Sequence, residues 1–257
     1  MAIVSKPHIL VCNDDGVHAP GLHKLAGALK SLGDVTVVAP DRERSAASHA
    51  LTLHKPLRVD QVKRRVFGIN GTPSDCVNLG VMRLVGAKPA LIASGINQGE
   101  NLGDDVTYSG TVSAAIEGTL LGIPSMAISL VGGGKKGLDA AAQIAFKLAE
   151  VMLTHGLPPD TLLNVNVPDL PVPQIRGVKF TTLGRRVFDE DSIVENTDPR
   201  GKKYYWIGGN RDAWQRRADA DHLAVEQGLI SITPLHLDLT NYRVLPELKG
   251  WEKLLKL

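Results

Sequence analysis

Residues 8–16, HILVCNDDG, decide the fold of this chain, because an unbroken apolar run ends there in two adjacent acids and a glycine. The apolar run at 9–12 is typical of a strand covered on both faces, as in a parallel sheet between two layers of helices. In open α/β sheets, ligands bind just beyond the carboxyl ends of the strands, where Asp14 and Asp15 lie. We therefore expect a Rossmann-like, three-layer α/β fold with a ligand site at this acidic pair.

The acidic pair leaves two interpretations open. Neighbouring carboxylates repel each other, so a bound cation would stabilise them, and carboxylate oxygens suit Mg²⁺, Mn²⁺ or Ca²⁺. Alternatively, Asp15-Gly16 forms a turn that only caps the next helix. A short motif matches often by chance, and this one alone favours neither interpretation.

The segments that follow repeat a strand-helix-strand pattern. Apolar spacing predicts a helix at 20–32 and a buried strand at 35–39, which together with the strand at 9–12 form a right-handed βαβ unit. Residues 51–67 alternate loosely and indicate irregular strand or hairpin structure. The same reasoning predicts further buried strands at 90–94, 124–130, 161–167 and 229–233, and helices at 76–85, 108–121, 138–153, 219–228 and 245–257.

Two loops leave the same sheet edge as the acidic pair, because the carboxyl ends of parallel strands meet there. The first, 41–49, contains Ser45, which either reaches the site or caps a helix. The second, 95–103, is rich in glycine and asparagine. The helix after it opens with small residues and two hydroxyls, Ser109 and Thr111, and such a helix start favours anions. Alternatively, the small residues at Gly110 and Ala114 only allow this helix to pack closely against its neighbours.

A glycine-rich loop at 132–137 matches G-x-G-x-x-G between a strand and a helix. We reject a dinucleotide site there, because the loop lies in mid-chain and no acid closes a following strand at the right distance. Lys135 and Lys136 indicate a solvated loop instead.

The C-terminal part has a different character. Alternating segments at 181–195 and 203–207, joined by a turn at 197–201, predict a hairpin that exposes an apolar face unless a partner chain covers it. We divide the chain into a Rossmann-like core, 1–176, and a C-terminal arm of the same structural unit, 177–257.

Composition limits the protein class. The 257 residues are 43% hydrophobic with net charge +2, which suits one large α/β domain and gives no case for nucleic acid as the main partner. Two cysteines, no basic-apolar leader and no run near the ~18 apolar residues of a membrane span lead us to expect a cytoplasmic protein.

With these residues in view, the chain resembles the SurE (survival protein E) family of metal-dependent 5′/3′-nucleotidases. The resemblance rests on six stretches in order along the chain: ILVCNDDG (9–16), APDRERSAAS (39–48), GTPSDCVN (71–78), SGINQGEN (94–101), YSGTVSAAIEG (108–118) and ISITPLHLDL (230–239). It implies a phosphatase of nucleoside monophosphates, with the choice between the 5′ and the 3′ position left open. It also implies one Mg²⁺ or Mn²⁺ per subunit, and a hairpin exchanged between subunits of a dimer or tetramer.

The resemblance implies metal ligands at Asp14, Asp15, Ser45 and Asn97, and phosphate-side residues at Asn101, Ser109, Gly110 and Thr111. Both Asp14 and Asp15 are assigned to catalysis. We favour Asp15 as the general base, because we expect it to have a carboxylate oxygen to spare for the proton of water. No D-x-D follows the strand, which argues against a phospho-aspartate intermediate. The alternative is a nucleotide-binding protein without catalysis, although a pure binder needs no such cluster. Residues 211–221 look longer and more basic than the family pattern.

Overall fold

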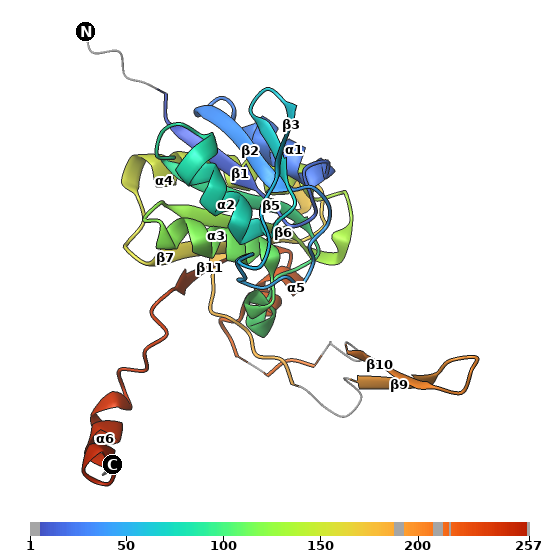
Figure 1. The fold of residues 1–257 in the computed structure, drawn as a ribbon, viewed down its shortest axis with the longest axis vertical. Coiled ribbons are helices and arrows are strands. Elements are labelled where there is room, and N and C mark those ends of the chain that lie inside the picture. The colour runs from blue at the N-terminus through green and yellow to red at the C-terminus, as the bar shows by residue number, and fades with distance from the viewer. Residues whose placement is uncertain (1–5, 188–192, 208–212, 216, 256–257) are drawn as a thin grey trace.

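The computed structural model describes residues 6–187, 193–207, 213–215 and 217–255. A nine-stranded sheet with the order β3-β4-β2-β1-β5-β6-β7-β11-β8 forms its centre (Figure 1). The parallel strands include β1 (His8–Cys12), which lies between β2 (Asp34–Pro40) and β5 (Leu91–Gln98). They continue through β6 (Ser125–Leu130) and β7 (Thr161–Val167). The acidic pair therefore follows a central strand.

Three strands run against this direction, so the sheet is mixed but mostly parallel. The first, β3 (Val59–Lys63), is antiparallel to β4 (Val66–Ile69) at one edge. The other two lie at the opposite edge: β11 (Leu229–His236) is antiparallel to β7, and β8 (Gly177–Phe180) is parallel to β11. The expected α/β class is confirmed.

The alternating side chains of β1 fill two separate cores. Ile9 and Val11 belong to the cluster under α1 (Pro20–Leu29) and α4 (Leu138–His155). Leu10 and Cys12 belong to the cluster under α2 (Pro73–Leu79) and α3 (Gly110–Leu120). These four side chains are fully buried, as a strand between two helical layers requires.

Several predicted helix boundaries are wrong by two or more residues. The first helix ends at Leu29, and the helix expected at 76–85 is α2 followed by a π-helical turn, Gly80–Leu84. The helix expected at 219–228 is the shorter α5 (Asp221–Glu226). At 245–257 the structure has α6 (Leu245–Lys249) and a 3₁₀ turn, Gly250–Lys253. This segment leads away from the sheet (Figure 1), so it has no core that would favour a longer helix.

The predicted hairpin is present, but its first arm is shorter than expected. Strands β9 (Ile193–Thr197) and β10 (Lys203–Ile207) pair antiparallel and project away from the sheet (Figure 1). Residues 181–187 form no strand with β10, because their backbone pairs elsewhere: the Thr181 N–H donates to the Ile232 carbonyl of β11 at 2.9 Å, and the Val187 N–H donates to the Ala213 carbonyl at 2.9 Å. Residues 188–192 lie outside the described part. Hairpin side chains are largely exposed, including Tyr205 at 58% and Ile207 at 82%. No helix in the described residues is long and apolar enough to span a membrane.

Candidate functional site

The acidic turn after β1 is closed by Asn13, not by the acids. The Asn13 side chain accepts from the Gly16 N–H and donates to the Gly16 carbonyl, both at 3.2 Å. Helix α1 begins after Ala19, which provides no side-chain cap. The interpretation of Asp14 and Asp15 as a helix-capping turn is therefore wrong, and both carboxylates remain for another role.

Asp14 lies against the N-terminus of α3. Its carboxylate accepts a hydrogen bond from the Thr111 hydroxyl, and its side chain is nearly buried. A Cβ built on Gly110 would lie 2.8 Å from the Asp14 Cβ, so only glycine permits this approach. Burial raises the pKa of Asp14, while hydrogen bonds from the side chain and backbone of Thr111 act in the opposite direction.

Asp15 has a buried carboxylate oxygen, Oδ2, that has no hydrogen-bond partner among the described residues. Burial raises the pKa of Asp15 to about 6, and the charges of Asp14 and Glu43 add to the effect. The backbone of Gln98, at the end of β5, acts against it. An unpartnered oxygen in a cluster of negative charge fits a cation held by oxygen ligands.

Ser45 lies on a loop that is bound to the acidic turn. The Arg44 N–H donates to the Asp14 carbonyl at 2.8 Å, which brings the next residue to this edge of the sheet. The Ser45 hydroxyl is exposed and donates to Glu43 Oε1 at 2.6 Å. No helix begins at Ser45, so its capping interpretation is wrong. Glu43 was not singled out from the sequence, where it is one charge among several.

Asn97 lies at the end of β5, next to Gln98, whose backbone faces Asp15. Its amide nitrogen donates to the Gly99 carbonyl at 2.9 Å, so the side-chain oxygen is the atom that can serve as a ligand. Among the described residues, no three His, Cys, Asp or Glu side chains gather into a metal cluster. A cation here would therefore need neutral oxygens, such as those of Ser45 and Asn97, beside the two carboxylates.

The predicted phosphate-side residues occupy different positions in the site. Ser109 caps α3, because its hydroxyl accepts from the Val112 N–H at 3.1 Å. Gly110 and Thr111 form the first turn of α3 against Asp14. Asn101 is buried, and its side-chain nitrogen donates to the Ser129 hydroxyl at 2.8 Å.

Two asparagines of β7 hold the backbone of Asn101. Asn164 Nδ2 donates to the Asn101 carbonyl at 2.8 Å, and Asn166 accepts from the Asn101 N–H at 2.9 Å. Sequence reasoning missed Asn164, Asn166 and Ser129. The signal was two asparagines at alternate positions of an otherwise apolar strand, LLNVNV, because such residues share one face.

The glycine-rich loop 132–137 is occupied by a carboxylate of the protein itself. The Gly137 N–H donates to Asp169 Oδ1 at 2.7 Å, and a Cβ on Gly134 would lie 1.8 Å from Asp169 Oδ2. The loop thus binds an internal anion where a dinucleotide motif would present free amides to a pyrophosphate.

These features define a class: a Rossmann-like α/β protein with carboxylate, hydroxyl and amide side chains at the carboxyl edge of its sheet. A model of the family "Survival protein SurE" matches residues 9–190. A relative from Geobacter metallireducens, named 5′-nucleotidase SurE, is 55% identical over 95% of this chain and 97% of its own. One of the same name from Geobacter sulfurreducens is 56% identical over 95% and 94%.

Structural comparison agrees with the sequence relatives. The crystal structure of a SurE protein from Aquifex aeolicus matches with a TM-score of 0.87 and 45% identity, over 96% of this chain and 100% of that one. The chain belongs to the SurE family, which confirms the resemblance stated from its motifs.

Proposed function

We propose that this protein is a divalent-metal-dependent phosphatase that releases phosphate from nucleoside monophosphates, as a 5′-nucleotidase with additional 3′ activity. The observation that carries the proposal is the acidic pair, with the unpartnered Asp15 oxygen next to the anion-favouring start of α3. The names of the relatives at 51–56% identity support the 5′-nucleotidase activity.

In this proposal, Asp14, Asp15, Ser45 and Asn97 hold one Mg²⁺ or Mn²⁺ per subunit. When bound, the cation supplies positive charge that polarises a phosphoryl oxygen. Asp15 is the proposed general base, because no donor among the described residues occupies its Oδ2, which can therefore accept the proton of the attacking water.

Asn101, Ser109, Gly110 and Thr111 are the proposed phosphate-side residues. The start of α3 contributes its dipole and backbone N–H groups, and Ser109 keeps its hydroxyl proton for donation because its oxygen serves as the cap. The Thr111 hydroxyl donates to Asp14, so we assign its side chain to orienting that carboxylate and its backbone to the anion.

The test is release of inorganic phosphate from nucleoside 5′- and 3′-monophosphates by the full chain, after chelation and then with added Mn²⁺ or Mg²⁺. We expect activity only with metal, and expect Asp14→Asn and Asp15→Asn to lose most of it at saturating metal while they stay folded. Asp139→Asn, an exposed acid paired with Lys24 on the helical layer, is the matched control and should keep full activity. Full turnover after exhaustive chelation contradicts the metal role, and nucleotide binding without phosphate release favours a silent binding protein.

A further inference from the structure

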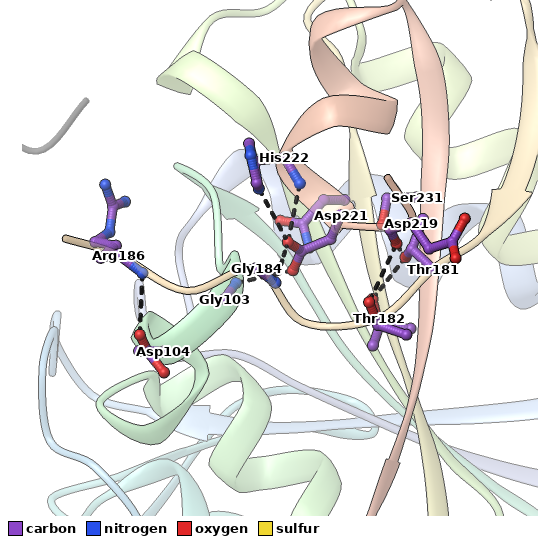
Figure 2. A network of polar contacts seen from close by, with 12 residues as sticks. Gly103, Asp104, Thr181, Thr182, Gly184, Arg186, Asp219, Asp221, His222 and Ser231 are labelled. Carbon is purple, nitrogen blue, oxygen red and sulfur yellow. Dashed lines mark hydrogen bonds and ion pairs between the residues drawn. The ribbon is translucent and has the colours of Figure 1, made fainter. Parts of the chain in front are cut away.

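The buried carboxylate of Asp221 joins the loop that carries Asn101 to the root of the hairpin. Its Oδ2 accepts from the Gly103 N–H at 2.8 Å, and its Oδ1 accepts from the Gly184 N–H at 2.8 Å (Figure 2). Oδ1 also accepts from the His222 N–H at 2.9 Å. Asp221 is fully buried, and Gly103 comes two residues after Asn101. Two segments far apart in the sequence are thus held at a fixed separation.

This connection places Arg186 over two acids of the same loop. The Arg186 N–H donates to Asp104 Oδ2 at 3.1 Å (Figure 2). The guanidinium donates to Asp105 Oδ2 through Nε at 2.9 Å and Nη2 at 2.5 Å. The Arg186 side chain is 7% exposed and that of Asp105 is 22% exposed, so water screens this pair less than an ordinary surface ion pair.

An aromatic stack holds the guanidinium in place. The Arg186 Cζ lies 4.2 Å from the Trp214 ring centroid, and the Trp214 ring stacks on His222 at 4.4 Å with an interplanar angle of 8°. A Cβ on Gly103 would lie 2.6 Å from the Trp214 ring. Trp214 belongs to 211–221, the segment that looked unlike the family; residues 211, 212 and 216 lie outside the described part.

The position of the two acids gives this arrangement a role. Asp104 and Asp105 lie in the 3₁₀ turn Gly103–Thr107, which leads directly to Ser109 at the start of α3. At ~2 Å of rise per residue, their carboxylates are on the order of 10 Å from the helix N-terminus. Uncompensated, they would repel an anion there, since this distance is close to the ~8–10 Å screening length of physiological salt.

We propose that Arg186 is a positioning residue of the phosphate site: it offsets the charge of Asp104 and Asp105 so that the loop can accept a phosphoryl group. The inference rests on the proposed phosphatase function, and it makes phosphate affinity depend on the root of the hairpin. A unit charge at ~10 Å, in an effective dielectric of ~80 to ~20, changes affinity by about 2- to 15-fold.

The experiment measures binding of inorganic phosphate to the Mn²⁺-loaded full chain by calorimetry, together with kcat and KM for a nucleoside monophosphate. We expect Arg186→Gln to weaken phosphate binding by about 2- to 15-fold and to raise KM more than it lowers kcat, with a smaller effect at high salt. Arg186→Lys should retain most of the affinity. Arg185→Gln is the matched control, because Arg185 is adjacent, equally charged and exposed.

Substitutions of Asp105 distinguish an effect of the Arg186 charge from an effect of its geometry. Asp105→Asn in the Arg186→Gln background should restore phosphate affinity, because the loop regains its original net charge. Asp105→Asn alone should tighten phosphate binding, and this variant keeps the inference testable if Arg186→Gln does not fold. An unchanged phosphate affinity in folded Arg186→Gln, or in Asp105→Asn, overturns the inference. A wild-type protein that binds phosphate but releases none from nucleotides contradicts the proposed function. The binding comparisons between variants would still test the role of Arg186 in that case.

Discussion

Gly110→Ala tests the close approach between α3 and Asp14. The new Cβ would lie 2.8 Å from the Asp14 Cβ and 2.9 Å from its Oδ2, whereas ordinary contacts are 3.4–4 Å. The gap must therefore open by about 0.5–1 Å, and a displacement of this size at a reacting centre costs on the order of 100-fold in rate. Overpacking costs ~1–3 kcal/mol of unfolding free energy. The helix preference of alanine offsets up to ~1 kcal/mol of this cost, so we expect a net loss of ~0–3 kcal/mol.

The assay is kcat at saturating Mn²⁺ with the thermal unfolding midpoint measured on the same samples. Gly27→Ala is the matched control, because Gly27 is an exposed residue within α1 and its new Cβ would meet nothing within 4 Å. We expect it to keep full activity and to gain up to ~1 kcal/mol. A folded Gly110→Ala protein with wild-type kcat would refute the argument that this contact positions Asp14.

Three further outcomes are expected. Replacing Lys135 and Lys136 by Ala should leave phosphatase kinetics unchanged, and a titration that shows micromolar NAD binding to the 132–137 loop would contradict our reading of it. Light scattering coupled to size exclusion should show a dimer or tetramer built through the β9–β10 hairpin; a monodisperse species near 27.5 kDa, fully active at nanomolar concentration, argues against it. The His49 hydrogen bond lowers the pKa of Glu117, so its stabilisation is present above the ordinary value of 4.5 and is lost as the pH falls through the folded pKa. Glu117→Gln should therefore reduce the fall in unfolding midpoint between about pH 5 and pH 3, and an equal fall in both proteins would exclude this role.

Local sequence patterns were sufficient to predict the parallel part of the sheet. The apolar run at 9–12 identified a strand covered on both faces, and short strand-helix alternation limits the connections to right-handed crossovers. The same patterns predicted that Asp14 and the Ser45 loop lie at one edge of the sheet. The hydrogen bond from the Arg44 N–H to the Asp14 carbonyl confirms that the loop and the acidic turn are neighbours. The boundary at residue 176 and the individual site roles stay predictions.

Contacts between distant segments were not predictable in this way. Arg186 and Asp105 are 81 residues apart, and nothing in either local sequence marks the other as its partner. The insertion of β11 between β7 and β8 depends on tertiary packing, because the apolar pattern of a buried strand is the same in either direction. The hydrogen bond from Asn164 to the Asn101 carbonyl depends on the order of the strands in the sheet. The alternation of residues along a single strand carries no information about that order.

The place of β11 in the sheet has a consequence for synthesis of the chain. β8 leaves the ribosome about fifty residues before β11, yet β11 is its neighbour in the sheet, so β8 must wait unpaired until His236 has emerged. Through that interval β7 also presents an open edge, and such edges pair readily with other chains. Long-range pairing of this kind slows folding, since the chain loses the entropy of closing the intervening loop before any favourable contact forms. We therefore expect the newly made chain to be most vulnerable to aggregation late in synthesis, when every proposed metal ligand is already in place.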